Sequence, residues 1–282
     1  MDKIEIETKE KEDILDILIK NEKAMDLYKQ LVSDIYFQWH SHRADKQNNF
    51  ACSYLFKKRN ISKELVDKMN EVAVVGQLDK KALETRKQWI LQQVKKLKLN
   101  KKNKVLLKKG FEFIADLAHN LSTNCTGWLC FLFCDGDGNP ICIKFREGYS
   151  KEIRTLSLYP TGKLGIFPYH YTRERLSTLG NNARVFFCEG EFNSLAIYSA
   201  MHNLNQFDFA IVSIGSSQNC DFTAISKLYA GRTPIFIPDN DEASQGVIEA
   251  CYENDWGVIV PEQFNLFKME KNDALSDAAT GL

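Results

Sequence analysis

Three stretches of the sequence decide the fold: Arg-Val-Phe-Phe-Cys-Glu-Gly-Glu at 184–191, Ile-Val-Ser-Ile-Gly at 211–215 and Pro-Ile-Phe-Ile-Pro-Asp-Asn-Asp at 234–241. A short apolar run bounded by turn residues predicts a strand that is buried on both faces. Such strands belong to parallel sheets covered by helices. Helix-length segments separate these strands, which implies right-handed crossovers and a parallel sheet. We expect strands at 183–188, 209–214, 234–237 and 257–260, and helices at 191–202, 220–229 and 242–253.

Carboxylates follow two of these strands directly. Glu189 ends the first strand, and Asp239 and Asp241 follow the third. Ligands of open α/β sheets bind outside the carboxyl ends of the strands. Residues two apart on extended backbone point the same way, so the two aspartates would share one face and would need a cation or a proton between them. Mg²⁺ is the simplest partner; the alternative is a solvated turn with scattered acids.

The same residues carry a family resemblance. Glu-Gly-Glu-Phe-Asn at 189–193 and Asp-Asn-Asp-Glu-Ala at 239–243 resemble a Toprim domain, with the greatest similarity to primases of the bacterial type and of the phage and mitochondrial primase–helicase type. The usual pattern there is Glu-Gly-x-x-Asp, followed later by Asp-x-Asp. Asn193 stands where an Asp is common, which removes an outer carboxylate, and Ser244 stands where a Gly often follows, which changes a helix start.

The resemblance implies an α/β fold in three parts. A Toprim domain with a central parallel sheet flanked by helices would occupy 183–282. A mixed α+β subdomain of a primase-like core would precede it at 110–182, and a helical N-terminal region with a basic segment would occupy 1–109.

The resemblance also implies an activity, that of a primase-like nucleotidyltransferase. Such an enzyme makes short primers on a single-stranded DNA template from nucleoside triphosphates, by phosphoryl transfer with two Mg²⁺ or Mn²⁺ ions. Glu189, Asp239 and Asp241 would be the catalytic residues and metal ligands. In the phrase 271–277, Asp273 would be a further ligand and Lys271 would offset charge near the metals; the alternative is a polar helix start.

Three basic residues are implied to contact the template or the nucleotide. Two β-type runs, 128–134 and 141–146, flank a Gly- and Asp-rich loop and predict a hairpin. This hairpin resembles a strand pair of the primase core, which implies that Lys144 and Arg146 face nucleic acid or nucleotide. The alternative is the exposed side of an alternating strand. Lys163 follows a turn at 160–162 and is implied to contact phosphate, unless it is a solvated turn lysine.

The residues 51–62 predict two helices separated by a turn. The first would end near Asn60, and Ser62 would cap the second. The phrase resembles an element that precedes the catalytic core of bacterial-type primases, with Asn60 in place of a Gly, which a left-handed residue position tolerates. The alternative is an ordinary helix corner.

Helices are also expected within 1–48 and at 111–121, where apolar residues recur at helical spacing. Between them, residues 86–109 hold ten Lys or Arg and no acid. A segment of one charge sign fits phosphate contacts, although it is also typical of a solvated helix face.

Composition limits the class of protein. The chain has 282 residues with 37 basic and 37 acidic side chains, so its net charge exerts no global attraction on nucleic acid. The eight cysteines lack paired spacing, and no signal peptide or membrane-length apolar run occurs. We therefore expect a cytoplasmic protein with free thiols and no membrane contact. Cys125, Cys130 and Cys134 are interpreted as core residues rather than zinc ligands.

Two other functions remain open at this point. Toprim folds support strand cleavage as well as nucleotide addition, so a metal-dependent nuclease is an alternative. Asn193 also leaves open a non-catalytic nucleic-acid-binding module. In the primase interpretation we expect a phage, plasmid or other mobile element as the source. We also expect a separate helicase as partner, because no P-loop occurs in this chain.

Overall fold

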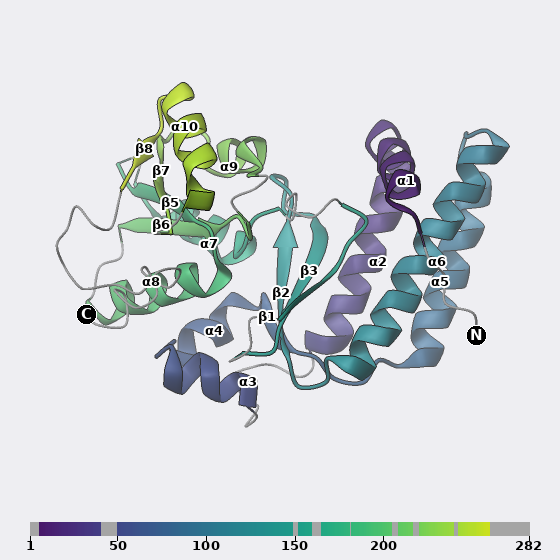
Figure 1. Ribbon diagram of the computed structural model, residues 1–282, viewed down its shortest axis with the longest axis horizontal. Coiled ribbons are helices and arrows are strands. Elements are labelled where there is room, and N and C mark those ends of the chain that lie inside the picture. The colour runs from purple at the N-terminus through teal and green to yellow at the C-terminus, as the bar shows by residue number, and fades with distance from the viewer. Residues whose placement is uncertain are drawn as a thin grey trace.

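The structure is a computed structural model that describes residues 6–40, 50–148, 152–159, 165–180, 182–204, 208–216, 220–239 and 242–259. A group of long helices lies on the right of Figure 1, a first sheet lies in the centre, and a second sheet lies at the upper left. None of the helices in the described residues is both long enough and apolar enough to cross a membrane.

The long helices come from the N-terminal part of the chain. They are α1 (Thr8–Lys20), α2 (Glu22–His40), α5 (Lys80–Lys96) and α6 (Lys101–Asn124). Asp79 and Asn100 cap α5 and α6, because their side chains accept hydrogen bonds from backbone N–H groups of the first turn. The helices expected within 1–48 and at 111–121 are confirmed. The second of them is only the C-terminal half of α6, which begins at Lys101 within the basic segment.

The first sheet is antiparallel, with the order β1-β2-β3-β4. Its strands are β1 (Val72–Val74), β2 (Leu129–Cys134), β3 (Pro140–Arg146) and β4 (Ile153–Leu156). The predicted hairpin is confirmed, with Leu129 opposite Arg146. The sequence does not predict β1 and β4, because each is short and becomes a strand only through pairing with a longer neighbour.

The helical corner at 51–62 also has the expected form. It consists of α3 (Phe50–Ser53), a π-helical turn (Tyr54–Lys58) and α4 (Lys63–Met69). Asn60 has a φ of 50°, in the left-handed region. Ser62 caps α4, since its Oγ accepts the Leu65 N–H at 3.3 Å. Both predictions are confirmed.

The second sheet is parallel throughout, with the order β6-β5-β7-β8. Its strands are β5 (Arg184–Cys188), β6 (Phe209–Ser213), β7 (Pro234–Ile237) and β8 (Gly257–Val258). The intervening helices are α8 (Glu191–Asn203), α9 (Phe222–Leu228), the 3₁₀ turn η4 (Glu242–Ser244) and α10 (Gln245–Glu253). The predicted alternation of parallel strands and helices is confirmed. Because the chain runs from β5 to one side and from β7 to the other, the topological switch point lies between these two strands.

Short hydrogen-bonded links join the two sheets. Ile166 and Cys134, the last residue of β2, exchange two backbone hydrogen bonds of 3.1 and 2.8 Å. The next residue, Phe167, exchanges a second pair with Ser213, the last residue of β6. The chain then enters α7 (Tyr169–Thr178), which leads to β5. The segment at 166–167 therefore fixes the end of one sheet against the end of the other.

The three cysteines predicted to be core residues are buried. Cys125, Cys130 and Cys134 are fully buried, and all eight cysteines of the chain are free thiols. Burial raises the pKa of the Cys130 and Cys134 thiols. The interpretation of these residues as core positions is confirmed.

A buried carboxylate, Glu71, caps α7. Its two oxygens accept the backbone N–H groups of His170 and Tyr171 at 2.9 and 3.0 Å, while its own carbonyl accepts the Leu132 N–H of β2 at 3.1 Å. Burial raises the pKa of Glu71 to about 7, although these N–H groups favour the charged form. Glu71 thus links the first sheet to the helix that leads into the second.

Replacement of Glu71 by Gln should change how stability depends on pH. A pKa raised from 4.5 to about 7 in the folded protein contributes stability that is complete below pH 4.5 and lost as the pH rises through 7. For wild type, this loss is on the order of 3 kcal/mol. Urea unfolding at several pH values should show a weaker decline for Glu71→Gln; parallel curves for the two proteins would contradict the assignment.

Candidate functional site

Glu189 and Asp239 lie at the carboxyl ends of the two strands that flank the switch point. Cys188 of β5 pairs with Ile237 of β7. Glu189 is the next residue after Cys188, and Asp239 is the second residue after Ile237. Both acids are therefore at the edge where open α/β sheets bind their ligands.

The Ser244 side chain connects the two acids. Its Oγ donates a hydrogen bond to Glu189 Oε1 and lies 3.1 Å from the backbone oxygen of Asp239. Ser244 is 1% exposed and Glu189 is 8% exposed. One hydroxyl group therefore contacts both the Glu189 carboxylate and the Asp239 backbone. The sequence predicts only a changed helix start at Ser244, but this serine also holds the Glu189 carboxylate.

Asn193 holds the other acid. Its Nδ2 donates a hydrogen bond of 2.6 Å to Asp239 Oδ1 from the first turn of α8. An Asp at position 193 would bring a second negative charge to this contact, whereas the amide supplies a neutral donor. The departure from the usual Toprim pattern therefore produces a carboxylate–amide pair.

The described part of this site fits a hard divalent cation. Glu189 and Asp239 offer carboxylate oxygens, the donors that Mg²⁺ prefers, and Asn193 and Ser244 fix one oxygen of each. Asp241 and Asp273 lie outside the described residues. The metal-binding and catalytic roles of all four acids stay predictions.

A buried ion cluster lies beside this site. Glu191, the first residue of α8, is fully buried, and its two oxygens contact the Nζ of Lys144 at 2.8 Å and the Nε of Arg146. Lys144 Nζ also donates to the Gly215 carbonyl at 2.8 Å. Lys144 and Arg146 are two apart on β3, so their side chains leave the strand on one face. That face is covered by the start of α8.

The charges in this cluster depend on one another. Burial alone would raise the pKa of Glu191, but the positive charges of Arg146 and Lys144 outweigh burial and lower it to about 2. Burial lowers the pKa of Lys144, and the attraction of Glu191 opposes that change. The carboxylate is therefore ionised at neutral pH and holds two cations of β3 against α8.

The four basic residues named from sequence have different positions. Lys144 is occupied inside the protein, with a side chain that is 3% exposed. Arg146 remains 20% exposed and can reach a ligand as well as Glu191. Lys163 and Lys271 lie outside the described residues. Contact of these four with nucleic acid or nucleotide stays a prediction.

A further cation, Arg59, is not predicted from the sequence. Its Nε donates to the Tyr54 hydroxyl at 2.6 Å, and its guanidinium lies 5.2 Å from the Tyr54 ring and 5.9 Å from the Phe192 ring. Arg146 lies 5.8 Å from the same Phe192 ring. Two guanidinium groups therefore border the residue that follows Glu191. The available signal was the position of Arg59 in a basic run that ends at the left-handed Asn60.

One other group of metal-ligand atoms occurs among the described residues. The ligand atoms of Glu71, Cys134 and His170 lie within 4.8 Å of one another. Both oxygens of Glu71 already accept backbone hydrogen bonds from α7. In this structure Glu71 therefore acts as a helix cap.

Comparison with known proteins adds the fold family. No family model and no curated protein sequence matches the chain. Among solved structures, the DnaG primase catalytic domain bound to single-stranded DNA aligns with 83% of this chain and 67% of its own, at 14% identity and a TM-score of 0.50. The fold is that of a DnaG-type primase catalytic core.

Two further primase cores align with this chain at the same TM-score. The RNA polymerase domain of Mycobacterium tuberculosis primase DnaG aligns over 90% of this chain and 82% of its own, with 10% identity and a TM-score of 0.50. The E. coli primase catalytic core aligns over 88% and 75%, with 14% identity and a TM-score of 0.50. The described parallel sheet and the sheet before it are consistent with the Toprim primase-core fold that the sequence predicts.

Loss of the Glu191 charge should destabilise this primase-core fold. Glu191→Gln leaves Lys144 charged, buried and without its counter-ion, which costs roughly 3–5 kcal/mol at neutral pH. Because the pKa of Glu191 is depressed from 4.5 to about 2, its contribution is present above pH 4.5 and is lost as the pH falls towards 2. Urea unfolding measures both effects.

A second substitution provides the control. Lys144→Met in the Glu191→Gln background removes the unpaired charge and should restore part of the lost stability. If Glu191→Gln unfolds at the same urea concentration as wild type, the ion cluster does not stabilise the junction.

Proposed function

We propose that the protein is a primase-like nucleotidyltransferase that makes short primers on single-stranded DNA with Mg²⁺ or Mn²⁺. The observation that carries this proposal is the pair of Glu189 and Asp239 at the switch point of a DnaG-type fold, joined through Ser244. One of the similar solved structures is a primase domain bound to single-stranded DNA, which supports the choice of template.

The proposed chemistry is addition of a nucleotide to a primer 3′-hydroxyl. Divalent ions bound here would activate that hydroxyl and neutralise the charge that develops on the triphosphate. Glu189 would act near the activated hydroxyl, and Asp239 with Asp241 would hold metal. Ser244 and Asn193 keep Glu189 and Asp239 in fixed orientations, which limits the rearrangement needed when ligands bind.

The proposed nucleotide side of the site is cationic. Arg59 and Arg146 border Phe192, which is the third residue after Glu189 in the sequence, and a planar guanidinium can bind phosphate through two hydrogen bonds. Arg146 is already paired with Glu191, so its position is fixed before a triphosphate arrives. Lys163 would add a phosphate contact, and Lys271 would offset charge near the metals. A separate helicase would supply unwound template.

Substitutions of the acids test the activity directly. Wild type should form labelled primers on single-stranded template with nucleoside triphosphates and Mg²⁺ or Mn²⁺, and EDTA should abolish them. Glu189→Gln and the double variant Asp239→Ala plus Asp241→Ala should lose at least about 100-fold in rate, because each removes oxygens that stabilise charge in the transition state.

A matched control is available on the same sheet. Asp208 precedes β6 at the opposite end of the strands and forms an exposed ion pair with Arg184 at 3.5 Å, so Asp208→Asn should keep full activity. Metal-dependent nicking of the template without primer formation would support a nuclease instead. Binding without either reaction would support a non-catalytic module.

Asn193→Asp gives an independent test of metal binding. The substitution places two carboxylates where a 2.6 Å hydrogen bond joins Asn193 to Asp239, and like charges at this distance need a cation. Without metal the variant should melt at a lower temperature than wild type, and Mg²⁺ should raise its Tm more than it raises the wild-type Tm. Equal responses to Mg²⁺ would argue against a metal at Asp239.

A further inference from the structure

A groove on the N-terminal helices has the features of a binding surface. It lies between the α1–α2 turn and the C-terminal half of α5 and has a volume of about 680 Å³. Trp89 of α5 lines it, and we call it the Trp89 groove. Its rim carries Lys20, Lys23, Lys96 and Lys98.

The charge of the groove favours an anion. The four lysines outnumber the two carboxylates that line it, Glu22 and Asp26. No carboxylate of the described residues pairs with Lys23 or Lys98. Lys20 pairs with Asp16 at 3.3 Å, but both side chains are more than two-thirds exposed (76% and 69%), so this pair is weak. Positive charge therefore remains available to a phosphate backbone.

Trp89 adds an aromatic surface to this charge. It is 40% exposed, and the Arg86 guanidinium lies 4.4 Å from its ring centroid. Arg86 is itself held by Asp34 and by Gln30, whose Oε1 accepts a 3.1 Å hydrogen bond. A second hollow, of about 550 Å³, borders Trp89 on the side of Arg86. The indole therefore lies between two hollows. A nucleic-acid base could stack on it, and the nucleic-acid strand could continue past it.

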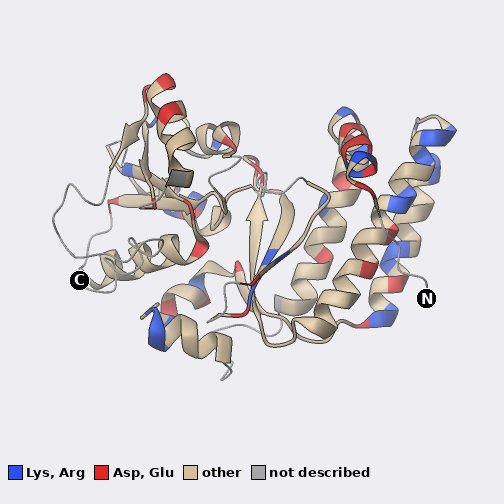
Figure 2. Cartoon of the chain, viewed as in Figure 1, with Lys and Arg blue, Asp and Glu red and all other residues tan. Residues whose placement is uncertain are grey.

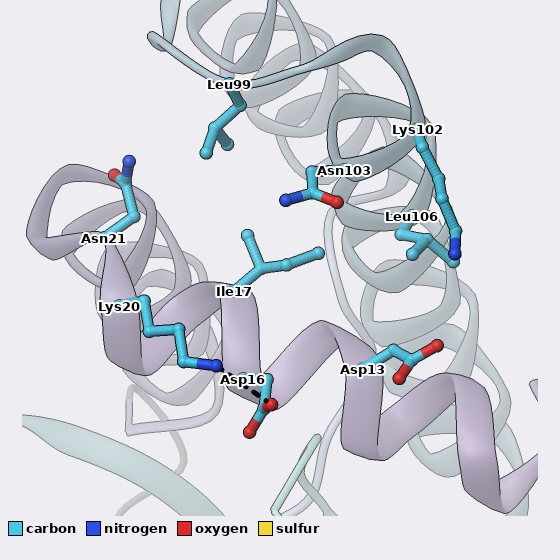
Figure 3. Close-up of a pocket in the computed structure, with 9 residues that line it drawn as sticks. All are labelled: Asp13, Asp16, Ile17, Lys20, Asn21, Leu99, Lys102, Asn103 and Leu106. Carbon is cyan, nitrogen blue, oxygen red and sulfur yellow. Dashed lines mark hydrogen bonds and ion pairs between the residues drawn. The ribbon is translucent and has the colours of Figure 1, made fainter.

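Further lysines lie near the Trp89 groove. Lysines continue through the α5–α6 turn, at the upper right of Figure 2, where Lys95, Lys101 and Lys102 are exposed. The neighbouring hollow of about 260 Å³ differs, because Asp13 and Asp16 of α1 line it opposite Lys102 (Figure 3). The acids there offset the lysines, so the Trp89 groove is the better anion site of the two.

We propose that the Trp89 groove binds a single-stranded nucleic acid, with Trp89 as a stacking platform and the rim lysines on the phosphates. Single-strand sites combine these two features, since an aromatic ring stacks on any base and a basic groove follows the backbone. This proposal rests on the proposed function in one respect, the choice of nucleic acid as the polymer that binds. The helices α1, α2 and α5, whose residues line the groove, lie on the opposite side of the first sheet from the second sheet (Figure 1), so the groove would hold template away from the carboxylates.

Binding of a fluorescent oligothymidine strand to the full chain tests the proposal by anisotropy. Trp89→Ala should weaken binding about tenfold or more through lost stacking, while Trp89→Phe keeps most of the affinity. With a strand that lacks bases, wild type and Trp89→Ala should bind equally. Lys96→Glu plus Lys98→Glu should weaken binding and reduce the slope of log affinity against log salt by about 1.4, for two lost phosphate contacts.

The control is a double charge reversal elsewhere on the same helices. Lys9 and Lys80 are exposed and line neither hollow at Trp89, so Lys9→Glu plus Lys80→Glu should change affinity much less. Equal losses in the two double variants, unchanged affinity in Trp89→Ala, or equal competition by polyglutamate would overturn the proposal. Failure of primer synthesis would not, because affinity is measured without nucleotides.

Discussion

The buried contact between Glu191 and the pair Lys144 and Arg146 is the interaction on which the rest of the structure depends. Charges inside a protein are tolerated only when they are paired and hydrogen-bonded, so this cluster requires β3 and the start of α8 to remain together. Glu189 lies two residues before Glu191. The same contact therefore fixes the end of β5, and with it one of the candidate catalytic acids, against the first sheet.

Backbone and capping contacts support that junction from the other side. The segment 166–167 exchanges hydrogen bonds with the ends of β2 and β6, and Glu71 holds the first turn of α7 from its position next to β1. These contacts join two sheets with different strand arrangements into one body. A site at their junction can then combine acids from one sheet with cations that the other sheet positions.

Neutral donors have a larger part in the site than the acid pattern suggests. Ser244 and Asn193 are the two positions where the chain departs from the usual Toprim pattern, and each orients one of the acids. A hydroxyl and an amide stabilise carboxylates without neutralising them, so the acids keep charge for a cation. Although the net charge of the chain is zero, the protein has two separate cationic regions, one at Arg59 and Arg146 and one around Trp89.

The sequence by itself determined the alternation of strands and helices after residue 183, the hairpin, the corner at Asn60 and Ser62, and the buried cysteines. These features follow from local periodicity and turn chemistry, which neighbouring residues are sufficient to specify. Only the tertiary structure decided that Lys144 is enclosed by Glu191, that Ser244 reaches Glu189, and that β1 and β4 are strands. Each of these depends on a partner far away in the chain, and a pattern of single residues does not record which distant groups will meet.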